Sequence, residues 1–93
     1  MTQIQINFLK AIYEEPKTAE QLCQELNITV SVTNDPIGAY YNELNRQIGY
    51  PSEQECEFED MFELIENSYG VPNKDTYYIK ERGEDFIKNL HKN

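Results

Sequence analysis

The chain has 93 residues, a formal net charge of −9 at pH 7 and 39% hydrophobic residues. This length fits one domain with its own core, and the hydrophobic fraction is too high for a disordered chain. No window approaches the length of a membrane span, and the first residues lack the basic and apolar regions of a secretory signal. We therefore expect a single domain over residues 1–93 in the cytoplasm, without a membrane partner.

Cysteine and histidine content argues against a disulfide framework or a metal site. Cys23 and Cys56 lie far apart in the sequence, and His91 is the single histidine. Two such thiols are typical of a reduced intracellular chain. Cys23 falls on an apolar helical stripe and is expected in the core, whereas Cys56 is expected to be partly exposed. With no phosphate loop, calcium loop or nucleophile motif, we expect no catalytic residue, no cofactor and no enzymatic activity.

Two capping-box patterns predict the first two helices. Thr2 is followed three residues later by Gln5, and Thr18 is followed by Gln21 at the same spacing. Apolar residues at intervals of three and four then define one buried face for each helix. These residues are Ile4, Phe8, Leu9 and Ile12 in the first helix, and Leu22, Cys23 and Leu26 in the second. The first helix is expected to end at Pro16 and the second near Asn27.

A third helix is predicted after the β-branched stretch ITVSVTND, which favours an extended connector or a short strand. Asn34 or Asp35 can cap this helix, because Pro36 suits a first helical position. Gly49 is expected to end it. Its predicted inner face consists of Ile37, Tyr40, Tyr41, Leu44 and Ile48.

The acidic run SEQECEFEDMF, residues 52–62, admits two local structures. As a helix, it begins with a capping box at Ser52 and Glu55 and places Phe58, Met61, Phe62 and Ile65 on one face. As a strand, it places its glutamates on one side and Cys56 and Phe58 on the other. We expect a short helix that gives way to a strand at about Phe62 to Asn67, because the following segment needs a hairpin partner.

The last third of the chain predicts a hairpin and a helix. SYGVPNKD is dense in turn formers, and TYYIK has the composition of a strand. Adjacent strand residues point to opposite faces, so one of Tyr77 and Tyr78 is expected to face outward. ERGEDFIKNLHK then places Phe86, Ile87 and Leu90 on one face of a closing helix. The expected fold is mainly α with a small antiparallel β-hairpin, in the order helix, helix, helix, hairpin, helix.

Three segments resemble winged helix-turn-helix domains of bacterial transcription regulators. The run YYIKERGEDFIKNL resembles the end of the wing and the start of the last helix, TAEQLCQELNI resembles the first helix of the helix-turn-helix pair, and PIGAYYNELNRQIGY resembles the recognition helix. The resemblance covers nearly the whole chain. It implies a DNA-associated winged-helix protein, a transcription regulator or a phage or mobile-element accessory factor. The chain departs from the family pattern in Lys80, which replaces the usual threonine, in the long connector 27–34, and in the acidic run.

The resemblance implies double-stranded DNA as the partner, bound by the third helix and the wing, with a monomer and a homodimer both open. The candidate DNA-binding residues are Asn42, Asn45, Arg46, Gln47, Lys74, Lys80 and Arg82. The first four are expected to face outward, where their amide or guanidinium groups can pair with base edges. The last three can contact phosphates. A merely solvated face remains the plainer alternative for each base-reading residue.

Charge favours a second class of partner. Residues 1–66 contain three basic and thirteen acidic side chains, a net of −10, and residues 67–93 contain five basic and four acidic, a net of +1. Spaced carboxylates on a rigid element can imitate a row of phosphates and attract a basic protein. The candidate protein-binding residues are Glu53, Glu55, Glu57, Glu59, Asp60 and Glu63. The alternative function is an acidic protein-binding module or DNA mimic that inhibits a basic nucleic-acid-binding protein, and the plain alternative is a solubilising face.

Overall fold

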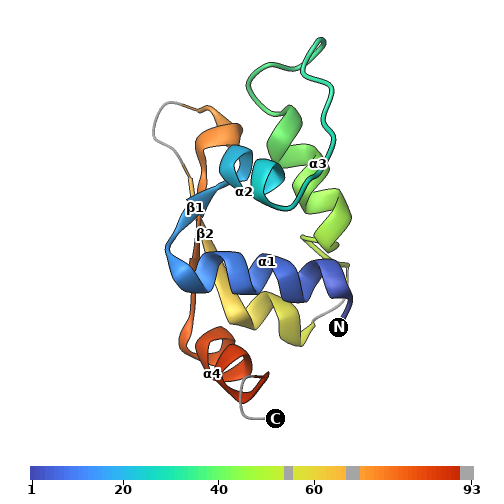
Figure 1. The fold of residues 1–93 in the computed structure, drawn as a ribbon. Helices are drawn as coiled ribbons and strands as arrows, with labels where there is room; N and C mark the ends of the chain where they lie inside the picture. Colours follow the sequence, from blue (N-terminus) through green and yellow to red (C-terminus); the bar gives the residue numbers. More distant parts are fainter. Residues whose placement is uncertain (54–55, 67–69, 91–93) are drawn as a thin grey trace.

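A computed structural model describes residues 1–53, 56–66 and 70–90 (Figure 1). In chain order, the elements are α1 (Gln3–Glu14), β1 (Lys17–Thr18), α2 (Ala19–Glu25), α3 (Ala39–Ile48), the 3₁₀ helix η1 (Glu57–Met61), β2 (Phe62–Ile65), the 3₁₀ helix η2 (Pro72–Lys74), β3 (Thr76–Ile79) and α4 (Glu81–Leu90). The described residues therefore form a mainly helical fold with a small antiparallel sheet, as the sequence predicts.

The two capping boxes start α1 and α2 as predicted. The Thr2 hydroxyl accepts a hydrogen bond from the Gln5 amide at 3.3 Å, and the Gln5 side chain accepts one from the Thr2 amide at 2.9 Å. Thr18 and Gln21 repeat this exchange at the start of α2. Each pair satisfies amides that would otherwise lack an intrahelical partner, so each helix start is fixed locally.

The sheet contains one strand more than the predicted hairpin. Its order is β1-β3-β2, and β3 pairs antiparallel with both neighbours. Thr18 lies opposite Thr76 in one pair, and Leu64 lies opposite Tyr77 in the other. β1 has only two residues, so no alternating pattern could reveal it in the sequence.

Lys17 of β1 is buried and connects three elements. Its ammonium donates to the Ala11 carbonyl of α1 at 2.8 Å and forms ion pairs with Glu25 at 2.8 Å and Glu14 at 3.4 Å. Burial lowers the pKa of Lys17, but these two carboxylates outweigh burial and the pKa is raised overall. A charged lysine is therefore stable at this position because all its partners are acceptors.

α3 differs from the prediction at its start. The helix begins at Ala39, not at Pro36, and residues 27–34 form neither a helix nor a strand. The Asp35 carboxylate accepts from the Gly38 amide at 3.0 Å, so it caps a turn that precedes the helix. Ile37, expected on the inner face, lies in this turn and is 54% exposed. Gly49 ends α3 as predicted, with a φ of 74° in the left-handed region that glycine tolerates.

The acidic run forms a short helix followed by a strand, as expected, although the helix is 3₁₀. Phe58, Met61 and Phe62 are buried, whereas Ile65, which the helical alternative places on the same face, is 50% exposed. Glu55, the expected capping-box partner of Ser52, and Asn67, the expected strand end, lie outside the described residues. The Ser52 hydroxyl donates to the Glu59 carboxylate at 2.9 Å.

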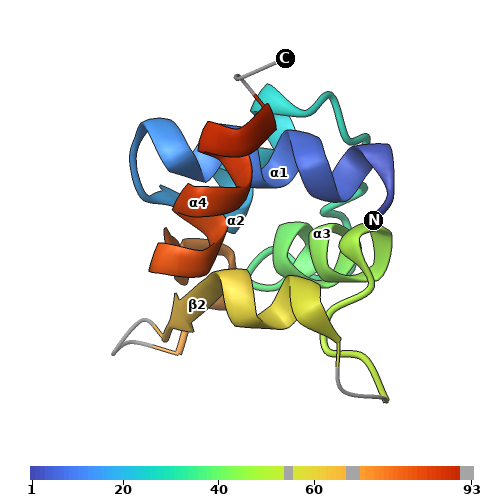
Figure 2. The same cartoon turned by 90° about the horizontal axis from the view of Figure 1, so that it is seen from below.

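The core is centred on aromatic rings from distant parts of the chain. Phe8 of α1 makes edge-to-face contacts with Phe58, Phe62 and Tyr77 at ring-centroid distances of 5.7, 5.0 and 5.3 Å. α3 and α4 both pack against α1 (Figure 2). In α4, Ile87 is buried as predicted, Phe86 is half-buried and Leu90 is exposed.

Candidate interaction surface

The outward face of α3 holds its only cation in an ion pair. Arg46 lies 70% exposed, and its guanidinium donates to Glu43 from Nε at 3.0 Å and from Nη2 at 2.5 Å. Gln47 donates to the same carboxylate at 3.0 Å. The hydrogen bonds from Arg46 and Gln47 lower the pKa of Glu43 to about 2. Arg46 and Gln47, two of the four predicted base-reading residues, therefore already donate their hydrogen bonds to Glu43 on the same helix.

The prediction that Asn45 faces outward is wrong. Asn45 is only 6% exposed, and its Oδ1 accepts a hydrogen bond from the hydroxyl of Tyr77 at 2.5 Å. The adjacent Leu44 is fully buried, so this flank of α3 faces the sheet rather than solvent. Asn42 does face outward, and its amide donates to the Asp35 carboxylate at 3.1 Å.

The connector forms a groove with this face of α3. Thr29, Val30 and Ser31 of the connector line it on one side, and Asn42, Glu43 and Arg46 of α3 line it on the other, together with Asp35 and Ala39. Its volume is about 440 Å³. Figure 1 shows the connector looping beyond the start of α3. A partner that approaches the outward face of α3 would therefore meet connector residues as well.

The three predicted phosphate-contacting residues do not form one patch. Lys74 ends η2, before β3, whereas Lys80 and Arg82 follow β3. A four-residue strand of about 13 Å lies between these positions. Lys74 and Lys80 are exposed, but Arg82 donates to Asp60 at 3.3 Å and lies 3.9 Å from Glu57.

We define the acidic surface as Glu57, Asp60 and Glu63, which are all exposed on η1 and β2. Arg82 of α4 compensates part of its charge through the two contacts just given. Glu53 is also exposed, Glu59 is half-buried and bonded to Ser52, and Glu55 lies outside the described residues. Of the predicted acidic residues, Glu57, Glu59 and Asp60 thus interact with other side chains of the chain, whereas Glu53 and Glu63 are exposed to a partner.

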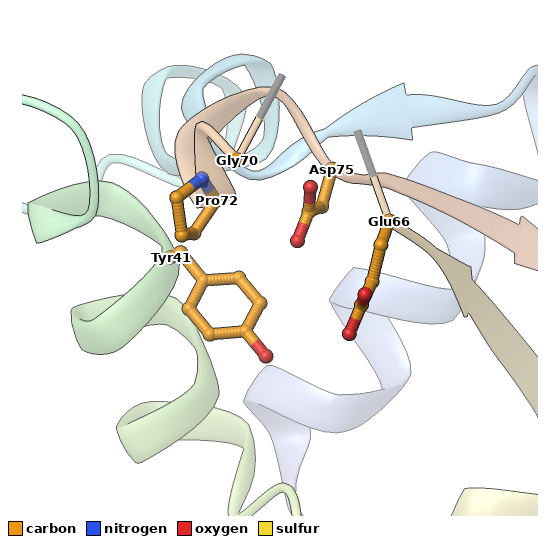
Figure 3. Close-up of a pocket in the computed structure, with 5 residues that line it drawn as sticks. All are labelled: Tyr41, Glu66, Gly70, Pro72 and Asp75. Carbon is orange, nitrogen blue, oxygen red and sulfur yellow. The ribbon is translucent and has the colours of Figure 1, made fainter. Parts of the chain in front are cut away.

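A pocket between α3 and the hairpin has no counterpart in the sequence prediction. It has a volume of about 220 Å³ and is lined by Tyr41, Glu66, Gly70, Pro72 and Asp75. Figure 3 shows the Tyr41 ring across the pocket from the carboxylates of Glu66 and Asp75. Burial raises the pKa of Tyr41, and the neighbouring Tyr50 and Asp75 raise it further. The pocket therefore has an acidic lining on the side of Glu66 and Asp75.

Asn73 connects this side of the hairpin to α3. Its side-chain carbonyl accepts from the Tyr41 amide at 3.0 Å, and its side-chain amide donates to the Pro36 carbonyl at 3.0 Å. Its backbone amide donates to the Ile37 carbonyl at 3.0 Å. The sequence predicts only a turn at Asn73, because Tyr41 and Pro36 lie more than thirty positions away and no local pattern indicates contacts with them.

Metal-ligand geometry and membrane-span length in the described residues, and similarity of the chain to known proteins, point to no particular activity. Among the described residues, no group of three or more His, Cys, Asp or Glu side chains is placed to hold a metal ion. None of the helices in that part of the chain combines the length and apolar character that a membrane span needs. Comparisons with protein-family models, curated proteins and solved structures found no match to this chain.

Proposed function

We propose that this protein is a winged-helix domain that binds a protein partner rich in lysine and arginine, with no catalytic role. The observation that carries this proposal is the pairing of Arg46 with Glu43. Arg46 is the one basic residue between Thr18 and Asn73, and both its bonds to the carboxylate are already made on α3. The helix expected to approach DNA thus offers a neutralised cation rather than a free one.

The winged-helix part of the proposal is supported by the order of the elements. α1, α2 and α3 precede the hairpin of β2 and β3, and α4 follows it. This is the order that the resemblance at TAEQLCQELNI, PIGAYYNELNRQIGY and YYIKERGEDFIKNL implies. This order does not specify a function, because one fold can support many functions, whereas the chemistry of the surface limits the partner.

Local charge favours a protein over DNA. Residues 18–73 contain eleven acidic residues and one basic residue, and this stretch includes α2, α3 and the first hairpin strand. DNA binding gains most of its affinity when lysine and arginine neutralise phosphates. An acidic surface repels phosphates but accelerates association with a basic protein. Both effects weaken as the salt concentration rises.

The acidic surface is the proposed contact region. Glu63 has no ion pair among the described residues, and Arg82 is shared between Glu57 and Asp60. An incoming lysine or arginine can pair with Glu63 directly and can compete with Arg82 for the other two carboxylates. The exposed pairs that it would replace are weak, so the exchange costs little.

DNA-associated regulation is the second candidate. It is favoured by the family resemblance and by the exposed positions of Lys74 and Lys80. These two residues flank β3 and could contact phosphates through the hairpin without using α3.

The test compares two matched double variants with the wild-type protein. Glu57→Lys with Glu63→Lys reverses the acidic surface, and Lys74→Glu with Lys80→Glu reverses the exposed basic positions. Each protein is incubated with random duplex DNA at low and high salt, and with cross-linker and host-cell extract followed by mass spectrometry. We expect no DNA retention, and a cross-linked basic protein that the acidic-surface variant alone loses. An enriched DNA motif that depends on Lys74 and Lys80 would overturn the proposal in favour of the second candidate.

A further inference from the structure

Strand β2 forms one edge of the sheet. In the order β1-β3-β2, it pairs with β3 on one side and has no strand on the other among the described residues. The edge of a sheet presents backbone N–H and C=O groups that can pair with another chain.

The register shows which residues present these groups. The Lys80 amide donates to the Met61 carbonyl at 2.9 Å, which extends the pairing of Phe62 with Ile79 and of Glu63 with Tyr78. Bonded and non-bonded pairs alternate in an antiparallel ladder. Glu63 therefore bonds to β3, whereas Leu64 directs its N–H and C=O groups away from β3. Within residues 1–53, 56–66 and 70–90, no hydrogen bond reaches these groups of Leu64.

The side chains around this edge differ between its two faces. On the core side, Phe62 is buried and contacts the Tyr50 ring at 5.1 Å. On the solvent side lie Glu63, Ile65 and Tyr78, of which Ile65 is half exposed and Tyr78 is 38% exposed. A strand placed beside β2 would therefore meet apolar side chains on one face and a carboxylate flanked by apolar groups on the other.

Charge along the strand favours a basic occupant. Glu63 is exposed within β2, and exposed Asp60 and Glu66 lie just before and just after the strand. The sequence has no lysine or arginine between Arg46 and Lys74. Charge also disfavours one way of pairing two copies of the chain through this edge. Antiparallel pairing of two β2 strands that bonds Phe62 of each copy to Leu64 of the other places Glu63 opposite Glu63, and like charges in that position are destabilising.

We propose that an extended basic segment of the protein partner adds to β2 as a fourth strand, with a lysine or arginine opposite Glu63. Such strand addition draws affinity from main-chain hydrogen bonds and specificity from alternate side chains. The inference rests on the proposed function, because it specifies how the basic partner binds the acidic surface.

The probe for the test is a synthetic peptide of alternating lysine and valine, about seven residues long so that it overhangs a four-residue strand at roughly 3.3 Å per residue. Two further peptides carry N-methyl groups on odd or on even residues, which blocks hydrogen bonding along one edge of the peptide only. Binding to the ¹⁵N-labelled full chain is followed by chemical shifts and by exchange protection of the Leu64 amide.

We expect the parent peptide to protect the Leu64 amide and to shift β2 more than β1. The peptide whose N-methyl groups face away from β2 should bind as the parent does. The peptide whose N-methyl groups face β2 should bind at least about tenfold more weakly, since it loses its backbone hydrogen bonds to β2. Glu63→Lys should weaken binding, whereas Glu15→Lys, an equal change of charge before β1 at the opposite edge, should weaken it much less.

The contrary outcomes separate the two proposals. If both N-methylated peptides bind as the parent does and Glu63→Lys still weakens binding, basic-partner recognition stands and strand addition is wrong. If no peptide shifts β2 up to about 1 mM, strand addition is also wrong. A dimer that protects Leu64 without peptide would assign the edge to a second copy. Failure of the proposed function itself is detected separately, by retention of duplex DNA through Lys74 and Lys80.

Discussion

The hydroxyl of Tyr77 donates a hydrogen bond to Oδ1 of Asn45 at 2.5 Å, and both side chains are buried. This bond joins the central strand β3 to the inner flank of α3. Burial raises the pKa of Tyr77 strongly, so the hydroxyl stays protonated and remains a donor. A residue that the sequence assigned to DNA is therefore part of the attachment of α3 to the sheet.

Tyr77→Phe should lower the free energy of unfolding by about 1–3 kcal/mol, because it leaves the buried Asn45 carbonyl without this donor. Urea denaturation measures the change. The matched control is Tyr78→Phe on the same strand, whose side chain faces solvent and which should change stability by less than about 0.5 kcal/mol. Equal effects of the two substitutions would show that the bond to Asn45 adds nothing to stability.

Gly83→Ala should destabilise the fold, although alanine favours helices by about 1 kcal/mol over glycine. A Cβ at Gly83 would lie 2.3 Å from the Met61 carbonyl oxygen and 2.7 Å from Cγ1 of Ile79, so α4 would have to move away from η1 and β3. Overpacking of this kind costs about 1–3 kcal/mol or more. Thermal and urea unfolding would be compared with Asn89→Ala, an exposed change in the same helix. A Gly83→Ala protein as stable as wild type would contradict this close packing.

Stability should fall as pH rises above 9, partly because of Cys23. Burial raises the pKa of this thiol from 9.0 to about 11, with a smaller contribution from Glu43. Between these values the unfolded chain has lost the proton and the folded chain has kept it, so a rise in pH favours unfolding. From about pH 8 to about pH 10, wild type should lose about 1 kcal/mol more stability than Cys23→Ala. Identical losses in the two proteins would exclude Cys23 as the cause.

Glu43→Gln should release Arg46 from its ion pair without making the protein bind DNA. The substitution removes the carboxylate that accepts from both Arg46 and Gln47. If the acidic surroundings exclude phosphates, neither wild type nor the variant should be retained on random duplex DNA at about 0.15 M salt. Glu15→Gln makes the same change of charge away from α3. Retention of Glu43→Gln but not of Glu15→Gln would show that α3 can face DNA once its arginine is free.

Local interactions explain which features were predictable. The starts of α1 and α2 depend on Thr2, Gln5, Thr18 and Gln21, whose bonds close within three residues and so appear as spacings in the sequence. The pairing of Arg46 with Glu43 is also local, because three residues separate them on one helix, so the sequence carries its signal as well. Ile37 continues the helical spacing of α3 but lies in the turn that Asp35 caps, so the spacing alone assigns it wrongly to the inner face.

The sequence by itself determined the four helices, the hairpin, the outward position of one of Tyr77 and Tyr78, and the acidic character of the chain, because periodicity, caps and charge are properties of neighbouring residues. Only the tertiary structure decided that Lys17 and Thr18 form a strand, that Asn45 is buried against Tyr77, and that Tyr41, Glu66 and Asp75 share a pocket. In each case the partners lie tens of residues apart. Their meeting depends on how α3 and the hairpin pack around the aromatic core, which no local pattern records.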